Sequence, residues 1–282
     1  APAMDLDMYS HPANQKNLET LSDFGVVVLP TEEGFLASGL HGKGRMMEPE
    51  SIVAFMEKDL HKTLPLKNKK VVITAGPTHE AIDPVRFIGN NSSGKMGFEL
   101  AKRAADLGAE VILISGPTNL SIKHVNIKLE QVVTADQMFE SSKKHYVDAS
   151  VFIASAAVAD FKPDNNATQK IKKGTGFDQI TLLPTPDILA YLGKIKKDQF
   201  LVGFALETEN ELENAKGKLE SKNLDAIVLN SLNDEQAGFG GNQNKITYLQ
   251  PNVNPISFEL KTKQEVAVDV FDQILLKYEK LS

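Results

Sequence analysis

From Lys69 onward, short runs rich in β-branched residues alternate with segments of helical periodicity. This alternation predicts strand–helix–strand crossover units, which stack into a parallel sheet with helices on both faces. The expected strands are 71–76, 110–116, 151–157, 200–205 and 225–230, and the expected helices are 96–107, 136–146, 187–194 and 209–222. The pattern therefore predicts an α/β fold with a doubly wound, mostly parallel, Rossmann-like sheet.

The two ends of the chain depart from this pattern. Closely spaced strands at 245–250 and 255–261, followed by a helix over 264–278, predict an antiparallel C-terminal portion. Upstream, we expect a helix over 14–23, a short strand over 26–29, a Gly-rich loop over 34–45 and a helix that begins at Pro49. That is too little to bury a core of its own. A charged linker around 64–68 divides the chain into domains 1–66 and 67–282.

Composition excludes several classes of protein. The 282 residues include 37 acidic and 31 basic ones, a formal net charge of −6 that disfavours nucleic acid as a partner. No apolar run approaches the roughly 18 residues of a bilayer-spanning helix, so we expect no membrane partner. The absence of cysteine excludes disulfides, thiolate metal sites and a thiol nucleophile, and fits the cytoplasmic location that we expect. The first residues lack the pattern of a secretory signal, and we expect the sequence to start inside a domain.

Gly89 to Lys95, GNNSSGK, matches the beginning of the phosphate-loop pattern G-x-x-x-x-G-K-[ST]. Met96 stands where the Mg²⁺-binding hydroxyl is needed, and the segment does not directly follow a predicted strand, so we reject a phosphate-loop ATPase. Two interpretations remain. The free N–H groups at the start of the next helix favour an anion, and a Ser-rich helix cap fits equally well.

Other polar residues follow the predicted strands, at the edge where such sheets bind ligands. Asp160 could hold a ribose or a base, or cap the next turn. Lys218 and Lys222 share one face of a helix, which is ordinarily a solvent face. The segment after Asp160 contains a cluster of lysines that suits a triphosphate or is a solvated loop: Lys162, Lys170, Lys172 and Lys173. The six His residues show no metal-ligand spacing, so no built-in metal site is indicated.

Longer motifs carry a resemblance to a known family. The run from VVITAGPTHEAIDPVRFIGNNSSGKMG to LISGP closely resembles the start of bacterial phosphopantothenate–cysteine ligase. ASAAVADFKP, KIKK, PTPDIL, VGFALET and KLESKNLDAIVLN follow in the family's order, so that the resemblance covers residues 68–282. PAMDLDMY and GFLASGLHGKGRMMEP resemble the closing segments of the flavin-dependent phosphopantothenoylcysteine decarboxylase, whose domain is flavodoxin-like. In bacteria the two activities are commonly fused, and this chain resembles such a bifunctional coenzyme A biosynthesis protein with most of the first domain missing.

The resemblance implies a two-step ligase reaction. The carboxylate of 4′-phosphopantothenate attacks the α-phosphate of CTP, giving an acyl-cytidylate and pyrophosphate, and the amine of cysteine then displaces CMP. Lys170 with Mg²⁺ would neutralise charge on the transferring group, while Asn90 and the nearby Arg86 would hold the acyl-cytidylate. The implied nucleotide contacts, besides Lys170, are Ala157, Asp160, Pro186, Asp187, Ile188, Leu189, Phe204, Lys218 and Lys222. The family's ligase is a dimer with a site completed across the interface, so we expect a homodimer.

The decarboxylase portion departs from its family's pattern. Asp5 and Tyr9 stand where the family has Asn and Trp, and Ser38 stands at the position of a proton-donating cysteine. A serine hydroxyl is a far weaker acid than a thiol. The upstream base and most of the FMN pocket are also absent from this sequence. We expect decarboxylation of phosphopantothenoylcysteine to 4′-phosphopantetheine in the full-length protein and not in these 282 residues.

Two other functions use the same type of sheet. An NAD(P)-dependent oxidoreductase should show further glycines after Gly76 and an acidic residue about 20 positions on, and neither is clear. A non-catalytic nucleotide sensor would bind CTP without needing Asn90 and Lys170 together.

Overall fold

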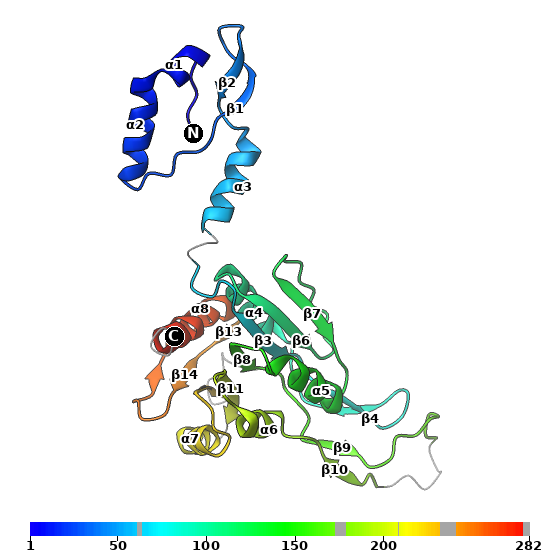
Figure 1. Ribbon diagram of the computed structural model, residues 1–282. Helices are drawn as coiled ribbons and strands as arrows, with labels where there is room; N and C mark the ends of the chain where they lie inside the picture. Colours follow the sequence, from blue (N-terminus) through cyan, green and yellow to red (C-terminus); the bar gives the residue numbers. More distant parts are fainter. Residues whose placement is uncertain (61–63, 173–178, 208, 232–240, 279–282) are drawn as a thin grey trace. The chain divides into compact units, whose positions relative to one another are not determined.

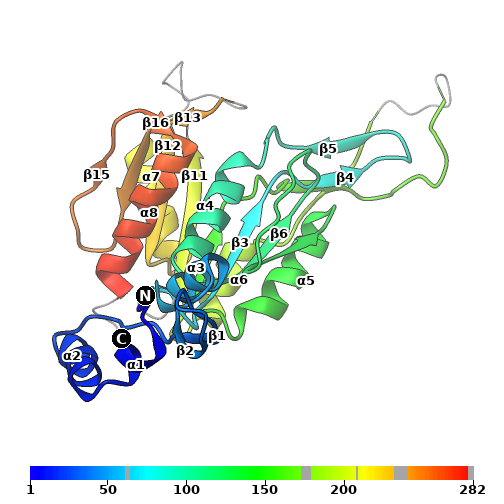
Figure 2. The same cartoon turned by 90° about the horizontal axis from the view of Figure 1, so that it is seen from above.

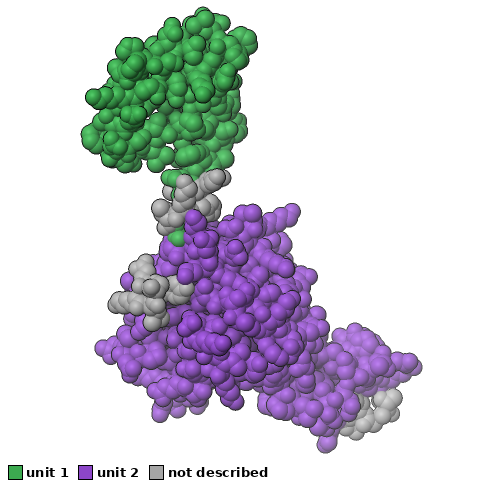
Figure 3. All heavy atoms as spheres, in the orientation of Figure 1, with its two compact units in different colours: residues 1–64 green, residues 65–282 purple. Residues whose placement is uncertain are grey.

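The computed structural model describes residues 1–60, 64–172, 179–207, 209–231 and 241–278. The chain divides into two compact units, Ala1–Leu64 and Pro65–Ser282, which are coloured separately in Figure 3. Lys173 of the lysine cluster lies outside the described residues. None of the helices in the described ranges is long and apolar enough to cross a membrane.

An 8-stranded sheet in the order β15-β14-β12-β11-β8-β3-β6-β7 forms the centre of the larger unit (Figure 1). The parallel strands are β3 (Lys70–Ala75), β6 (Glu110–Ser115), β7 (Ile127–Gln131), β8 (Val151–Ala154), β11 (Phe200–Glu207) and β12 (Ala226–Ser231). The strands β14 (Ile246–Leu249) and β15 (Ile256–Ser257) continue the sheet antiparallel. The predicted doubly wound sheet with an antiparallel C-terminal portion is therefore confirmed. Strand order reverses between β3 and β8, which makes their carboxyl ends the expected ligand site.

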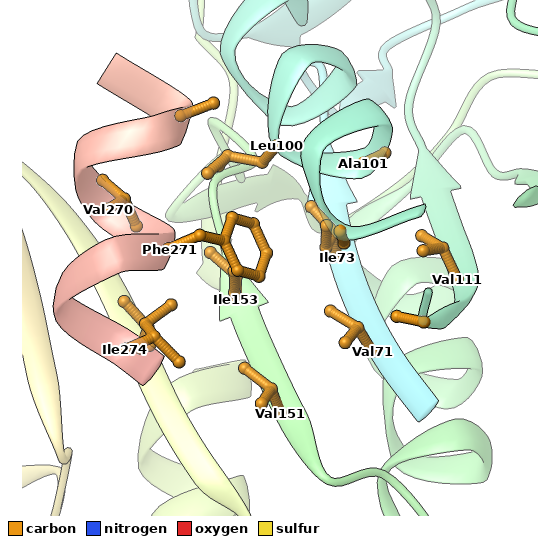
Figure 4. Close-up of a cluster of buried hydrophobic side chains, with 14 of the residues drawn as sticks. Val71, Ile73, Leu100, Ala101, Val111, Val151, Ile153, Val270, Phe271 and Ile274 are labelled. Carbon is orange, nitrogen blue, oxygen red and sulfur yellow. The ribbon is translucent and has the colours of Figure 1, made fainter. Parts of the chain in front are cut away.

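Helices cover both faces of this sheet because successive residues of each central strand point to opposite sides. Val71 and Ile73 of β3 join a core with α4 (Lys95–Asp106) and α8 (Lys263–Tyr278), and Figure 4 shows Phe271 of α8 facing these strands. Val72 joins the opposite core. The helices of that side are α5 (Ala135–Tyr146), α6 (Ile188–Ile195) and α7 (Glu211–Ser221).

Two small antiparallel pairs project from the sheet, as Figures 1 and 2 show, and we call them together the arm. The first pair is the hairpin β4 (His79–Ala81) and β5 (Phe87–Gly89), and the second is β9 (Phe161–Pro163) with β10 (Leu182–Pro184). The hairpin is anchored at its base, since the buried Glu80 accepts a hydrogen bond of 2.7 Å from Ala135 N at the start of α5. A further pair, β13 (Gln243–Asn244) with β16 (Lys261–Thr262), leads into α8.

The smaller unit contains α1 (Leu6–Ser10), α2 (Pro12–Asp23), β1 (Glu32–Phe35), β2 (His41–Arg45) and α3 (Pro49–Leu60). The helices expected over 14–23 and from Pro49 are confirmed. The strand expected over 26–29 is wrong: Val26 and Val27 are 49% and 56% exposed, so burial does not hold them in a sheet. The Gly-rich loop expected over 34–45 is also wrong, because its ends pair as the β1–β2 hairpin, with Gly34 opposite Gly42.

Candidate functional site

The segment after β8 is fixed to the segment after β3 by backbone contacts beyond the ends of both strands. Ala157 N donates to Gly76 O at 2.9 Å, and Pro77 forms a parallel bridge with Ala157. The Thr78 hydroxyl accepts from Ala159 N at 2.9 Å. The two segments thus make a rigid floor at the point where strand order reverses.

Several predicted site residues meet on this floor. The Asn90 side-chain amide donates to Val158 O at 2.9 Å. Thr185 N donates to Asp160 O at 3.0 Å, so the turn at Pro186 lies against the same segment. The side chains of Asn90 and Asp160 are exposed, which leaves the Asn90 carbonyl oxygen and the Asp160 carboxylate accessible to a ligand.

Lys218 of α7 and Lys222, which follows the last residue of this helix, both pair with carboxylates. Lys222 Nζ lies 2.8 Å from Asp187 Oδ2, and Lys218 Nζ lies 2.6 Å from Glu207 Oε1. Burial opposes ionisation of Asp187, yet the bonds from Lys222 and from Ala190 N keep the pKa of its carboxyl below the usual value. The face that the sequence alone would assign to solvent thus carries two ion pairs.

Ile188 and Leu189 play a different part from the other predicted contacts. Ile188 is 7% exposed, and both residues pack in the core beneath α6. Their side chains are therefore taken up by packing, and only their backbone groups at the start of α6 remain for a ligand.

Arg86 lies elsewhere, at the tip of the β4–β5 hairpin, where it contacts the segment that carries Lys170. Arg86 donates to Ile171 O at 2.9 Å, and Ile171 N donates to Asp83 Oδ2 at 3.2 Å. Within the described residues, no hydrogen bond or ion pair joins Arg86 or Lys170 to Asn90 or to residues 157–160. The predicted residues thus form two groups, one on the floor and one on the arm.

A cavity of ≈ 180 Å³ opens beside the floor. Phe204 of β11 and Ala157, two of the residues that the family resemblance implies as nucleotide contacts, line it together with the first turn of α4. Gly94 caps α4 with φ 75°, a left-handed conformation that favours glycine. Lys95, Asn230, Asn244 and Lys263 also line the cavity and were missed by sequence reasoning. GNNSSGK could have indicated Lys95, but no motif marks the other three.

In the smaller unit, the two predicted decarboxylase positions lie in different places. Asp5 precedes α1 without capping it by a side-chain hydrogen bond. Ser38 is exposed in the turn between β1 and β2, where its hydroxyl accepts from Leu40 N at 3.4 Å. Among the contacts of residues 1–60, none joins the Asp5 and Ser38 side chains.

Comparison with known proteins decides the family. Residues 66–277 match the model of the DNA/pantothenate metabolism flavoprotein C-terminal domain, and residues 1–61 match a flavoprotein model. The chain belongs to the DNA/pantothenate metabolism flavoprotein family. A Coenzyme A biosynthesis bifunctional protein CoaBC from Bacillus subtilis strain 168 is 44% identical, over 97% of this chain and 68% of the relative.

Two further similarities place this family member more closely. The solved C-terminal domain of a Coenzyme A biosynthesis bifunctional protein CoaBC superposes with a TM-score of 0.66 at 41% identity, covering 77% of this chain and 100% of that domain. A relative from an unknown prokaryotic organism, named Cysteine/Cysteine sulfinic acid decarboxylase, is 51% identical over 98% of this chain and 78% of its own length. The resemblance to bifunctional coenzyme A biosynthesis proteins is thereby confirmed.

The structure also weakens the oxidoreductase alternative. In a dinucleotide-binding sheet, an acidic residue at the end of the second strand holds the ribose. In this member of the DNA/pantothenate metabolism flavoprotein family, β6 ends at Ser115 and Gly116 follows. Neither residue can supply that carboxylate.

Proposed function

We propose that this chain joins 4′-phosphopantothenate to cysteine at the expense of CTP. The observation that carries the proposal is the floor on which Asn90, residues 157–160 and the Pro186 turn meet, beside a cavity lined by the start of α4. The first N–H groups of α4 have no partners within the helix and favour the phosphates of a nucleotide. Family membership supports the same reaction.

Each predicted group has a task in this reaction. Phe204 and Ala157 offer apolar surface to the nucleoside, and Asp160 offers an acceptor at the exposed edge of the floor. Asn90, held by its bond to Val158 O, can hydrogen bond the acyl-cytidylate without losing side-chain entropy on binding. As the carboxylate attacks the α-phosphate, the bond to the β-phosphate breaks and pyrophosphate leaves with the electron pair. The ammonium of Lys170 would stabilise the charge that develops.

Magnesium would accompany the nucleotide as a charge-neutralising ion. Mg²⁺ is usually bound by one or two carboxylates together with substrate phosphates, so a dedicated protein cage is unnecessary. Asp160, which is exposed at the edge of the floor, would contribute a carboxylate. Within the ranges that the structure describes, no group of three or more His, Asp or Glu side chains could hold a metal ion without a ligand.

FMN fits residues 1–60 poorly. A flavin site of the doubly wound type lies at the carboxyl ends of parallel strands. The described residues of the smaller unit contribute a two-stranded antiparallel sheet, and the large apolar side chains of Phe24 and Phe35 are each 78% exposed. We assign no step to FMN in this unit and keep the decarboxylase reaction as a proposal for a protein with a complete flavoprotein domain.

The arm suggests how the two groups of predicted residues could act together. Val85, Phe87, Phe161 and Leu183 are exposed apolar residues on the arm, 61%, 53%, 52% and 41% respectively. Burying them against a second copy of the chain would remove this surface from water. The Lys170 of one copy would then be delivered to the floor of the other, giving a homodimer with a shared site.

The experiment that tests the proposal is a ligase assay on the Lys170→Ala variant. With CTP, 4′-phosphopantothenate and cysteine, we expect pyrophosphate release to fall by at least about 100-fold, as for removal of one preorganised charge-stabilising group. Lys123→Ala, which removes an exposed lysine of another loop, should retain wild-type activity. Unchanged release in Lys170→Ala would refute the role of Lys170. Decarboxylation of cysteine sulfinic acid is measured in parallel and is expected to be absent.

A further inference from the structure

Lys263, the first residue of α8, is a buried cation in the wall of the cavity. It is 8% exposed and lines the cavity together with Met96 and Asn244. No described residue accepts a hydrogen bond from its ammonium group or forms an ion pair with it. A buried ammonium without a paired anion is costly, so it calls for an explanation.

A second lysine lies beside it. Lys95, at the start of α4, donates from Nζ to the side-chain oxygen of Asn242 at 2.8 Å. The main-chain oxygen of the same Asn242 accepts from Lys263 N at 2.9 Å. Burial, followed by the charge of Lys95, lowers the pKa of the Lys263 ammonium below its usual value. Asn242 thus contacts both residues, and the two ammonium groups lie close enough for the charge of Lys95 to disfavour that of Lys263.

The rest of this wall is polar and neutral. Asn244 is 4% exposed, and among the described residues its amide donates only to Met96 Sδ, a weak contact at 3.8 Å. Asn230 Oδ1 is buried without a hydrogen-bond partner among the described residues. A negatively charged ligand that accepts hydrogen bonds from the lysine ammonium groups and the asparagine amides would complement this wall of the cavity.

We propose that Lys263, together with Lys95, forms a subsite for the terminal phosphates of the nucleoside triphosphate and for the pyrophosphate that leaves. The inference rests on the proposed function, and it adds a residue from the far end of the sequence to the nucleotide site. The first turn of α4 lines the same cavity and directs its N–H groups to the same ligand. When the bond between the α- and β-phosphates breaks, Lys263 donates to the oxygens that receive the electron pair, and no proton needs to be transferred.

The packing alternative must be distinguished, since a lysine stem can cover apolar surface while its head reaches water. Lys263→Met preserves the length and apolar volume of the stem and removes only the charge. Lys263→Arg restores a charge at the same place. Lys216→Met, on the exposed side of α7, removes one charge of the same unit away from the cavity and serves as the matched control.

The test is calorimetric titration of the full chain with inorganic pyrophosphate, with CMP and with 4′-phosphopantothenate. We expect Lys263→Met to weaken pyrophosphate binding at least about tenfold, or 1.4 kcal/mol, and to leave the affinity for CMP unchanged. Lys263→Arg should stay within about threefold of wild type, because the phosphate site needs a cation more than a particular shape. Lys216→Met should bind all three ligands as wild type does.

Two results would overturn the inference. One is pyrophosphate affinity in Lys263→Met equal to that of wild type. The other is weakened binding of 4′-phosphopantothenate alone, which would assign the subsite to the phosphate of the other substrate. If Lys263→Met does not fold, Lys263→Gln is titrated by the same criteria. The titration needs no turnover, so a failure of the ligase assay with wild-type protein would remain a separate result.

Discussion

Asp83 is the residue through which the hairpin of the arm holds the segment that carries Lys170. Its carboxylate is buried. Within the hairpin it accepts hydrogen bonds from Val85 N at 2.9 Å, from Arg86 N at 2.8 Å and from Arg86 Nε at 2.9 Å. From the segment that carries Lys170, it accepts a hydrogen bond from Ile171 N at 3.2 Å. We therefore expect Asp83→Asn, which removes the charge that attracts these donors, to lower ligase kcat/KM by about tenfold or more through misplacement of Lys170. Steady-state rates with CTP measure this effect. Asp164→Asn, an exposed change on the arm, should have no effect, and a similar loss in both variants would contradict the positioning role.

The same carboxylate predicts a dependence of stability on pH. The side-chain bond from Arg86, followed by the backbone donors, holds the pKa of Asp83 well below its usual range. A group with a lowered pKa in the folded state contributes stability that is complete above the unfolded value, about 3.9, and is lost as pH falls below it. Thermal unfolding should therefore separate wild type from Asp83→Asn between pH 5 and 8, with the difference shrinking toward about pH 3. A difference that is constant over this range would show that the Asp83 charge is unimportant for stability.

At the scale of elements, the packing of α4 on β3 leaves no room for a side chain at Gly97. A Cβ at this position would lie 2.5 Å from Ala75 Cβ. We expect Gly97→Ala to lower the free energy of unfolding by about 1–3 kcal/mol, since the helix must move away from the strand. Denaturant titration measures this change. Gly217→Ala on α7, where a Cβ meets nothing within 4 Å, should instead raise the free energy of unfolding by about 0.5–1 kcal/mol.

Elements with continuous apolar runs were predictable from the sequence, and elements of other kinds were not. The apolar runs VVIT and VFIA predict β3 and β8, because a strand with both faces buried is apolar at nearly every position. β7, IKLEQ, lies at the edge of the sheet and mixes charged with apolar residues, so it was missed. The short strands of the arm were missed because they are only three residues each and pair outside the main sheet.

Some residues of the candidate site could be predicted from the sequence, and others could not. Residues directly after strands, such as Ala157 and Asp160, could be placed at the ligand edge by topology alone. Lys263 could not, since it reaches the cavity only through the pairing of β13 with β16 and the docking of α8 beside α4. Its role depends on burial, which the sequence around it, KTKQEV, does not indicate.

At the scale of the whole molecule, Lys170 belongs to the arm, whereas the proposed nucleotide binds on the floor. Within one chain the arm residues bond to one another, while Asn90 bonds to the floor. In the proposed dimer, a second copy packs against the exposed apolar residues of the arm. This contact would bring Lys170 of one copy close to the floor of the other, and it would bury apolar surface that is otherwise exposed to water. Association and catalysis should then be lost together, because one surface serves both.

The Leu183→Asp variant distinguishes the proposed dimer from a monomeric enzyme. Leu183 is 41% exposed on β10, so a charge there should not disturb the fold but should oppose burial in an interface. We expect light scattering to give wild type twice the 30.9 kDa mass of one chain and Leu183→Asp the mass of a single chain, with ligase activity greatly reduced. Val253→Asp, at a similarly exposed position of 47% outside the arm, should remain dimeric and active. A dimeric Leu183→Asp would move the interface away from the arm, whereas an active monomer would mean that Lys170 serves the floor of its own chain.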